Sequence, residues 1–135
     1  RMAMPGFGPY SASKFALEGF SESLRLELAP FGISVALVEP GSYKTDIWRK
    51  GFDLVKPSPD SPYREMTEAV FRTARQTAEQ AGDPGEVAER IAALVDHPHP
   101  PLRHPIGRGM TAVLAARSLL PWNWYERMVR RVLGI

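Results

Sequence analysis

The chain has 135 residues, of which 44% are hydrophobic and 24% charged, and it contains no cysteine, which excludes disulfide bonds and thiolate metal sites. The net charge of +2 is uneven, because residues 101–135 carry six Arg and one Glu, whereas residues 1–100 carry 11 Lys or Arg and 14 Asp or Glu. There is no signal peptide and no apolar run long enough to span a bilayer, so we expect a soluble cytoplasmic protein.

The chain begins with a Gly- and Pro-rich stretch, RMAMPGFGP, which predicts a loop. A helix is expected over residues 9–29, because Pro suits a first helical turn and apolar side chains cover more than one face. One of these faces would pack on a sheet and the other could meet a second subunit. Gly32 is expected to end the helix in a left-handed conformation.

Tyr10 and Lys14 lie four residues apart in this helix, so they project from the same face. An ammonium beside a phenol favours the phenolate, which makes the pair a suitable acid and base for an alcohol or a ketone. The same spacing also occurs by chance in ordinary solvent-exposed pairs. The side chains around the pair are small enough to let a ligand come close: Ser11, Ala12, Ser13 and Ala16.

Residues 33–39 form a short apolar run that predicts a parallel strand covered on both faces. Ligands of open α/β sheets bind at the carboxyl ends of strands, which is where Pro40 and Gly41 lie. Gly41 permits a tight turn and the close approach of a flat ring. A Pro-Gly turn with no ligand is the alternative interpretation.

Residues 42–82 are polar and interrupted by prolines, which is typical of a substrate loop or lid, with a helical stretch over residues 63–81. The apolar side chains of residues 47–55 could close a substrate pocket or pack the lid onto the body. A further helix is expected over residues 83–96, with Asp83 as its N-cap and Glu86 in a capping box. Its buried stripe would be formed by Val87, Ile91, Leu94 and Val95.

Residues 97–135 predict a last strand within residues 102–107 and a helical tail that is split at Pro121. The second helix, over residues 122–133, places aromatic and apolar side chains beside arginines. Such a helix can lie on an anionic membrane surface, or cover a groove of its own subunit or of a partner. We expect no nucleic-acid partner, because the basic excess is small and no binding motif appears. The three histidines lie among prolines without a carboxylate cluster, so we expect no metal site: His97, His99 and His104.

The order Tyr10-x-x-x-Lys14, long helix, apolar strand and Pro40-Gly41-x-x-x-Thr45 resembles the C-terminal half of a short-chain dehydrogenase/reductase. The sequence of residues 83–87, followed by that of residues 102–107 and a proline-split tail, is similar to steroid- and retinol-type members. The resemblance implies an α/β fold, namely the C-terminal part of a Rossmann-type doubly wound parallel sheet. The N-terminal dinucleotide-binding half and the catalytic serine of resembling enzymes would precede Arg1.

The resemblance also implies an NAD(P)-dependent oxidoreductase that interconverts an alcohol and a ketone or aldehyde, with a lipophilic substrate. Tyr10 would exchange the proton, and Lys14 would support it and bind the nicotinamide ribose. The expected cofactor-binding residues are Tyr10, Lys14, Pro40, Gly41, Tyr43 and Thr45. The expected substrate-binding residues are Phe7, Gly8 and Trp48.

By the same resemblance, the protein would form a homodimer or homotetramer, use NAD or NADP, and act on a small-molecule alcohol or carbonyl compound. These 135 residues alone would be inactive, because the phosphate-binding half is absent. A non-catalytic dimerisation or binding module is one alternative. A sugar-nucleotide epimerase, which uses Tyr and Lys at the same spacing, is another.

Overall fold

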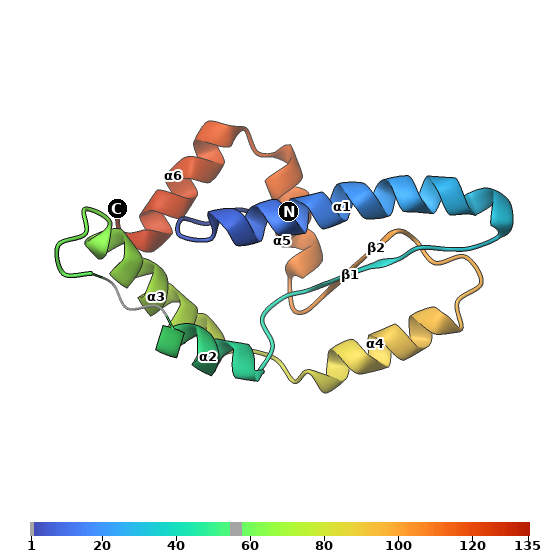
Figure 1. Ribbon diagram of the computed structural model, residues 1–135, viewed down its shortest axis with the longest axis horizontal. Coiled ribbons are helices and arrows are strands. Elements are labelled where there is room, and N and C mark those ends of the chain that lie inside the picture. Colours follow the sequence, from blue (N-terminus) through green and yellow to red (C-terminus); the bar gives the residue numbers. More distant parts are fainter. Residues whose placement is uncertain (1, 55–57) are drawn as a thin grey trace.

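The computed structural model describes residues 2–54 and 58–135. These residues form a helix-rich α/β fold around a small parallel sheet (Figure 1). The α-helices and strands follow one another in this order: α1 Gly8–Leu28, β1 Leu37–Pro40, α2 Asp46–Leu54, α3 Arg64–Glu79, α4 Gly85–Val95, β2 Arg103–Ile106, α5 Met110–Leu119 and α6 Trp122–Leu133.

The two strands run parallel, with Leu37 opposite Arg103 and Pro40 opposite Ile106. Their carboxyl ends therefore meet at the same edge. Helices α1 and α4 lie on opposite sides of the strands (Figure 1). The predicted α/β class with a parallel sheet is confirmed.

Helix α1 begins at Gly8 with Pro9 in its first turn, as Pro at this position permits. It ends in a 3₁₀ turn over Ala29–Phe31, followed by Gly32 at φ 70°. The Gly32 N–H donates to the Ala29 carbonyl at 3.0 Å. Both the expected helix and its left-handed glycine are therefore observed, within one residue of the predicted bounds.

Strand β1 is shorter than the run over residues 33–39 predicts, because it begins only at Leu37. Its first ladder bond runs from the Leu37 N–H to the Leu102 carbonyl at 2.6 Å. The chain before Leu102 contains Pro100 and Pro101, which have no N–H to continue a ladder. Ile33 consequently lies outside the sheet and is 52% exposed.

The expected lid over residues 42–82 contains two helices, α2 and α3, of which only the second was predicted. Residues 55–57, including Val55, lie outside the described residues. The Trp48 ring stacks on Phe52 with 6.3 Å between ring centroids, and Phe52 lies 5.9 Å from Phe71 of α3. These contacts pack α2 against α3 within the expected lid, so they decide neither for a substrate pocket nor for packing of the lid onto the body.

Two details of α4 differ from the prediction. The Asp83 carboxylate accepts a hydrogen bond from the Gly85 N–H at 2.9 Å, but Glu86 does not complete a capping box, because its carboxylate accepts from Tyr43 instead. The expected buried stripe is also wrong, since Ile91 is 46% exposed and Val95 is 79% exposed. Hydrophobic periodicity identifies an apolar face but not what covers it.

The C-terminal helices match the prediction closely, with the break between α5 and α6 at Pro121. The ring of Tyr125 is buried beneath the guanidinium of Arg117, 4.3 Å from its centroid. Among residues 2–54 and 58–135, no helix is both long enough and apolar enough to cross a membrane.

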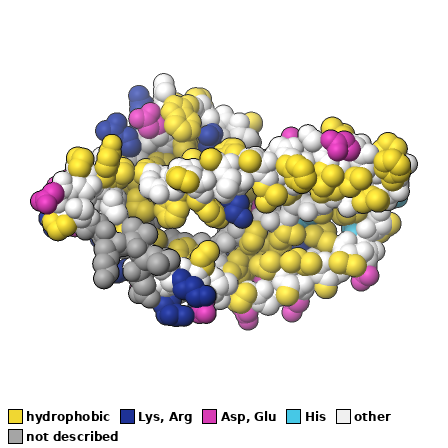
Figure 2. All heavy atoms as spheres, in the orientation of Figure 1, with side chains coloured by type: hydrophobic (Ala, Val, Ile, Leu, Met, Phe, Trp, Pro, Cys, Tyr) yellow, Lys and Arg dark blue, Asp and Glu magenta, His cyan; other side chains and the backbone are white. Residues whose placement is uncertain are grey.

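The chain exposes far more surface than a compact monomer of its mass. Its accessible area is 10076 Å², whereas a folded monomer of 15.0 kDa exposes about 7,000 Å². No large side chain is fully buried in the described part of the chain. Hydrophobic side chains lie in the open along α1 (Figure 2), so this helix carries a face available for an interface.

Candidate active site

Tyr10 and Lys14 occupy the N-terminal turns of α1 and lie together as the spacing predicts. The Lys14 Nζ is 5.6 Å from the centroid of the Tyr10 ring. The edge of Phe7 meets the same ring, with 6.4 Å between centroids. Tyr10 is 56% exposed, and neither its hydroxyl nor the Lys14 ammonium hydrogen-bonds to any described residue. Both groups are therefore accessible to a ligand.

Helical periodicity shows which way this pair points. Residues four and seven positions apart share a helix face, so Lys14 lies on the face that carries Glu18 and Ser21. Glu18 contacts Arg103 of β2, and Ser21 is buried. Tyr10 precedes Lys14 by four residues and shares this face. The phenol and the ammonium thus project from the side of α1 that faces the sheet.

The turn that leaves β1 is held by backbone hydrogen bonds. The Gly41 N–H donates to the Ile106 carbonyl at 2.9 Å, and the Gly82 N–H donates to the Ser42 carbonyl at 2.9 Å. A side chain at Gly41 would bring its Cβ within 2.8 Å of the Met110 Cε. The end of β1 and the start of α5 therefore approach closely at Gly41, where a side chain would have to displace the flexible end of Met110.

Tyr43 follows this turn and points into the fold. Its hydroxyl donates to Glu86 Oε2 at 3.0 Å, and its ring packs against Gly82. Burial, and then the hydrogen bond to the Glu86 carboxylate, raise the pKa of Tyr43. The Tyr43 hydroxyl is therefore already hydrogen-bonded within the chain. The backbone of Tyr43, and not its phenol, is the part that lies nearest the turn. Sequence reasoning missed Glu86 as its partner, because 43 residues separate the two.

Trp48 and Thr45 flank the start of α2. The indole N–H of Trp48 donates to the Tyr43 carbonyl at 2.8 Å, so this side chain also braces the turn. Thr45 is exposed immediately before the first residue of α2, and its hydroxyl has no hydrogen-bond partner among the described residues. Pro40 is exposed as well. The two substrate-side candidates before the helix, Phe7 and Gly8, are also exposed.

Strand β1 runs toward the N-terminal half of α1, so its carboxyl end and the N-terminal turns of α1 lie on the same side of the strands (Figure 1). In the space-filling view an opening lies below this part of α1, beside the segment that leaves β1 (Figure 2). An acid–base pair and an exposed hydroxyl beside strand carboxyl ends is an arrangement that can bind a polar ligand and transfer a proton.

The histidines are engaged locally. The His99 N–H donates to His97 Nδ1 at 3.1 Å, and His104 Nε2 lies 2.7 Å from the Pro101 carbonyl oxygen. Within residues 2–54 and 58–135, no group of three or more metal-binding side chains is assembled.

Comparison with known proteins adds an independent observation. A family profile described as short chain dehydrogenase matches residues 1–54. The chain is 46% identical over 132 residues to an uncharacterized oxidoreductase, YusZ, of Bacillus subtilis, covering 96% of this chain and 47% of that protein. It is 33% identical over 118 residues to retinol dehydrogenase 8 of Bos taurus, covering 83% of this chain and 38% of that protein.

A solved structure is also similar. The crystal structure of a short-chain dehydrogenase from Streptomyces avermitilis matches with a TM-score of 0.62 and 34% sequence identity, covering 96% of this chain and 47% of that one. The chain therefore spans about half the length of the relatives that it matches.

Proposed function

We propose that this chain, which belongs to the short-chain dehydrogenase/reductase family, carries the proton-transfer part of an NAD(P)-dependent oxidoreductase. The reaction would interconvert an alcohol and a ketone or aldehyde. The single observation that supports it most is the exposed pair of Tyr10 and Lys14 on the sheet-side face of α1, with 5.6 Å between the ammonium and the ring centroid.

The two side chains have distinct roles in this proposal. In the direction of oxidation, the Tyr10 phenolate accepts the hydroxyl proton of the alcohol, and in the direction of reduction the phenol returns it. The Lys14 ammonium favours the phenolate electrostatically. It retains donors for the ribose hydroxyls of the cofactor.

The residues present fit a nicotinamide cofactor. The Lys14 ammonium, the Thr45 hydroxyl and the backbone that follows Pro40 offer donors for ribose hydroxyls and for a carboxamide, and these side chains have no polar partner among the described residues. When bound, the nicotinamide supplies the hydride acceptor or donor. Tyr10 and Gly41 would lie beside it, and Tyr43 would contribute through its backbone. Both NAD and NADP are compatible with these residues.

We assign a lipophilic substrate to the same site. Phe7 packs against the Tyr10 ring, and Gly8 leaves space beside it. Trp48 lies on α2, and its indole N–H contacts the turn that leaves β1. Support also comes from the similarity to a protein named retinol dehydrogenase 8, whose name specifies a lipophilic alcohol.

The test is an assay of hydride transfer by the full-length protein. The change in NAD(P)H absorbance is measured with each member of a panel of lipophilic alcohols and ketones. Tyr10→Phe should lower kcat by at least about 100-fold, because it removes the proton-transfer group. Tyr63→Phe is the matched control, since this ring is 65% exposed and lies away from the site, on the turn before α3. Activity that survives Tyr10→Phe would refute the proposed mechanism and favour a non-catalytic module.

We further propose that the protein is a homodimer or a homotetramer assembled through α1. The surface of this helix outside its sheet-facing side leaves Phe20 63% exposed and Leu26, about a third of a turn further round the helix, 76% exposed. Large apolar side chains that are exposed in the middle of a helix are typical of a subunit interface.

We also propose that α6 makes a peripheral contact with a membrane surface. Trp124, Met128 and Val132 recur every four residues on this helix and are 64%, 47% and 60% exposed. Arg127 and Arg131 lie next to them, one turn apart. Trp and apolar side chains beside arginines suit the surface of an anionic membrane.

A further inference from the structure

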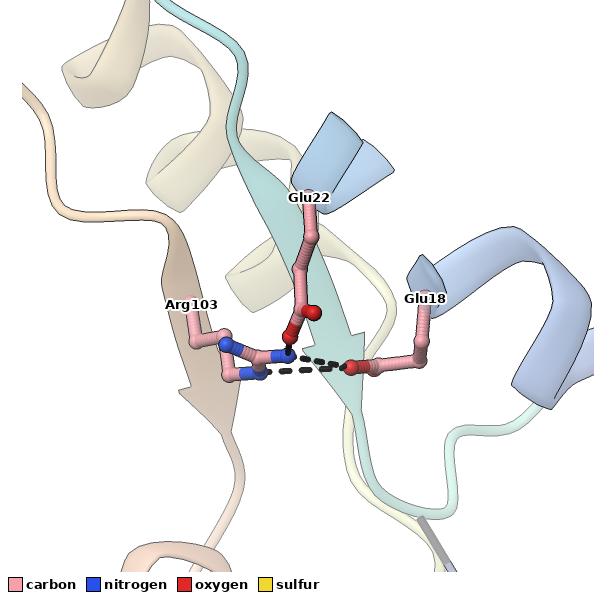
Figure 3. Close-up of polar contacts among 3 residues, drawn as sticks. All are labelled: Glu18, Glu22 and Arg103. Carbon is pink, nitrogen blue, oxygen red and sulfur yellow. Dashed lines mark hydrogen bonds and ion pairs between the residues drawn. The ribbon is translucent and has the colours of Figure 1, made fainter. Parts of the chain in front are cut away.

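One guanidinium links the last strand to α1. The Arg103 Nη2 donates to Glu18 Oε2 at 2.8 Å, its Nε donates to the same oxygen at 3.2 Å, and its Nη2 also donates to Glu22 (Figure 3). The two carboxylates come from successive turns of one helix, and the arginine comes from β2. The hydrogen bonds to Glu22 and Glu18 raise the pKa of Arg103, so it stays charged.

The cluster is well enclosed for an ion pair. The Arg103 side chain is 25% exposed and that of Glu18 is 17% exposed. By comparison, Arg64 and Glu68 of α3 form an ion pair at 3.0 Å, with side chains 56% and 45% exposed. The Glu22 side chain is 52% exposed, so the enclosed contact is the one between Arg103 and Glu18. Water and salt screen this contact less, so it constrains geometry more strongly than the pair on α3.

Polar contacts, more than apolar packing, fix the rotation of α1 about its axis. The buried side chains of this helix are two serines, Ser11 and Ser21. Near its C-terminal end, Arg25 donates to the Pro100 carbonyl at 2.7 Å and to the Val35 carbonyl. The Arg103 cluster is the corresponding attachment nearer the N-terminus.

Rotation of α1 matters for the site because Glu18 lies one turn after Lys14 and two turns after Tyr10. If the helix turned by about 20°, an atom about 6 Å from its axis would move by about 2 Å. A misplacement of about 1 Å can lower a rate by about 100-fold. The attachment at Glu18 therefore controls where the Tyr10 hydroxyl lies.

We propose that Arg103 is a positioning residue for the Tyr10–Lys14 pair: by binding Glu18 and Glu22 it sets the rotation of α1 about its axis. This inference rests on the proposed function, since the pair that it positions is the proposed proton-transfer group. Arg103 itself touches neither substrate nor cofactor in this scheme.

The experiment uses full-length protein carrying Arg103→Met, Glu18→Gln or both, with Arg64→Met as the matched control for loss of an Arg–Glu pair. We measure kcat and KM, and separately the Kd of NADPH and NADH from their fluorescence. Arg103→Met should lower kcat by at least about 10-fold and weaken binding of the preferred dinucleotide several-fold. Arg64→Met should change each value by less than about twofold.

The double variant tests whether Arg103 acts through Glu18. Arg103→Met and Glu18→Gln remove the two ends of one attachment, so the double variant should lose about as much kcat and dinucleotide affinity as Arg103→Met alone. If the two losses add, or if Arg103→Met matches Arg64→Met, the inference is overturned. If Arg103→Met does not fold, Arg103→Lys replaces it, because lysine retains the positive charge. Arg103→Lys should give an intermediate kcat at an unchanged melting temperature. A wild-type kcat in that variant would count against the positioning role.

Failure of the proposed function gives a different pattern. Tyr10→Phe, assayed in the same series, should abolish turnover whatever residue occupies position 103. If Tyr10→Phe remains active, the proposed function fails. If Tyr10→Phe is inactive and Arg103→Met is fully active, only the positioning role fails.

Discussion

The hydroxyl of Tyr125 donates a hydrogen bond to the carbonyl of Ala3 at 2.8 Å, across 122 residues of sequence. Tyr125 is only 3% exposed, so this bond is shielded from water. It attaches α6 to the loop that leads into α1. The C-terminal tail thereby restrains the segment that precedes Tyr10.

Removal of this hydroxyl should destabilise the protein measurably. Tyr125→Phe keeps the ring beneath Arg117 but leaves the Ala3 carbonyl without its donor, which should cost about 1 kcal/mol in the free energy of unfolding. Chemical denaturation of full-length protein measures the change, with the exposed Tyr63→Phe as the control at less than about 0.5 kcal/mol. Equal stability of the two variants would show that the bond contributes nothing.

Two glycines near the site should respond differently to alanine. At Gly82 the new Cβ would lie 2.9 Å from Cε1 of the buried Tyr43 ring, whereas at Gly41 it would meet the flexible end of Met110 at 2.8 Å. Gly82→Ala should therefore cost about 1–3 kcal/mol, because a packed ring must move. Gly41→Ala should cost less than about 1 kcal/mol, because a methionine end can rotate. Denaturation midpoints test this order, and a larger loss at Gly41 would contradict it.

The buried phenol of Tyr43 should make stability depend on pH in the alkaline range. Its pKa is raised in the folded state by burial and by Glu86, so the folded protein holds this proton more tightly than the unfolded chain does. The stabilisation is complete below about pH 10 and is lost as the pH rises through the folded pKa. Unfolding free energies measured between about pH 8 and pH 11 should fall less steeply for Tyr43→Phe than for wild type. Tyr63→Phe should retain the wild-type slope. Identical slopes in all three proteins would show that Tyr43 does not cause the alkaline loss of stability.

Local sequence patterns predicted the helices around the site well. Pro9 and Gly32 bracket α1, and helical periodicity placed Tyr10 and Lys14 on one face. Pro121 marked the start of α6 in the same way. These features depend on residues within a turn or two of one another, so the sequence contains the information needed.

Contacts between distant segments could not be predicted. Glu86 occupies the capping-box position of α4 in sequence, but its carboxylate binds Tyr43, which lies 43 residues earlier. Arg103 binds Glu18 across 85 residues, and no spacing rule connects a strand residue to a particular helix turn. Helix α2 was missed because it is short and its apolar side chains gain stability only by packing on α3.

The outer face of α1 should control the assembly state. Phe20→Asp combined with Leu26→Asp places two charges where large apolar side chains are now exposed, so a dimer formed through this face should dissociate. Light scattering of full-length protein should then give the mass of one subunit. Leu119→Asp is the control, because Leu119 is 83% exposed on α5 and lies outside this face. An unchanged mass in the α1 variant would assign the interface to another surface.

The exposed stripe of α6 should bind anionic vesicles. Tyr125 and Leu133 are buried on one side of this helix, while Trp124 and Met128 are exposed on another, so the stripe remains accessible after α6 packs on its own chain. Each arginine near an anionic surface contributes about 1 kcal/mol, so Arg127→Gln with Arg131→Gln should weaken binding to phosphatidylserine-containing vesicles about 30-fold. Because the attraction is electrostatic, added salt should weaken the wild type toward the level of this variant. Co-sedimentation of full-length protein with these vesicles, and with phosphatidylcholine alone, measures both effects. Equal binding of wild type and variant would exclude α6 as the membrane contact, because the arginines would then lie away from the lipid.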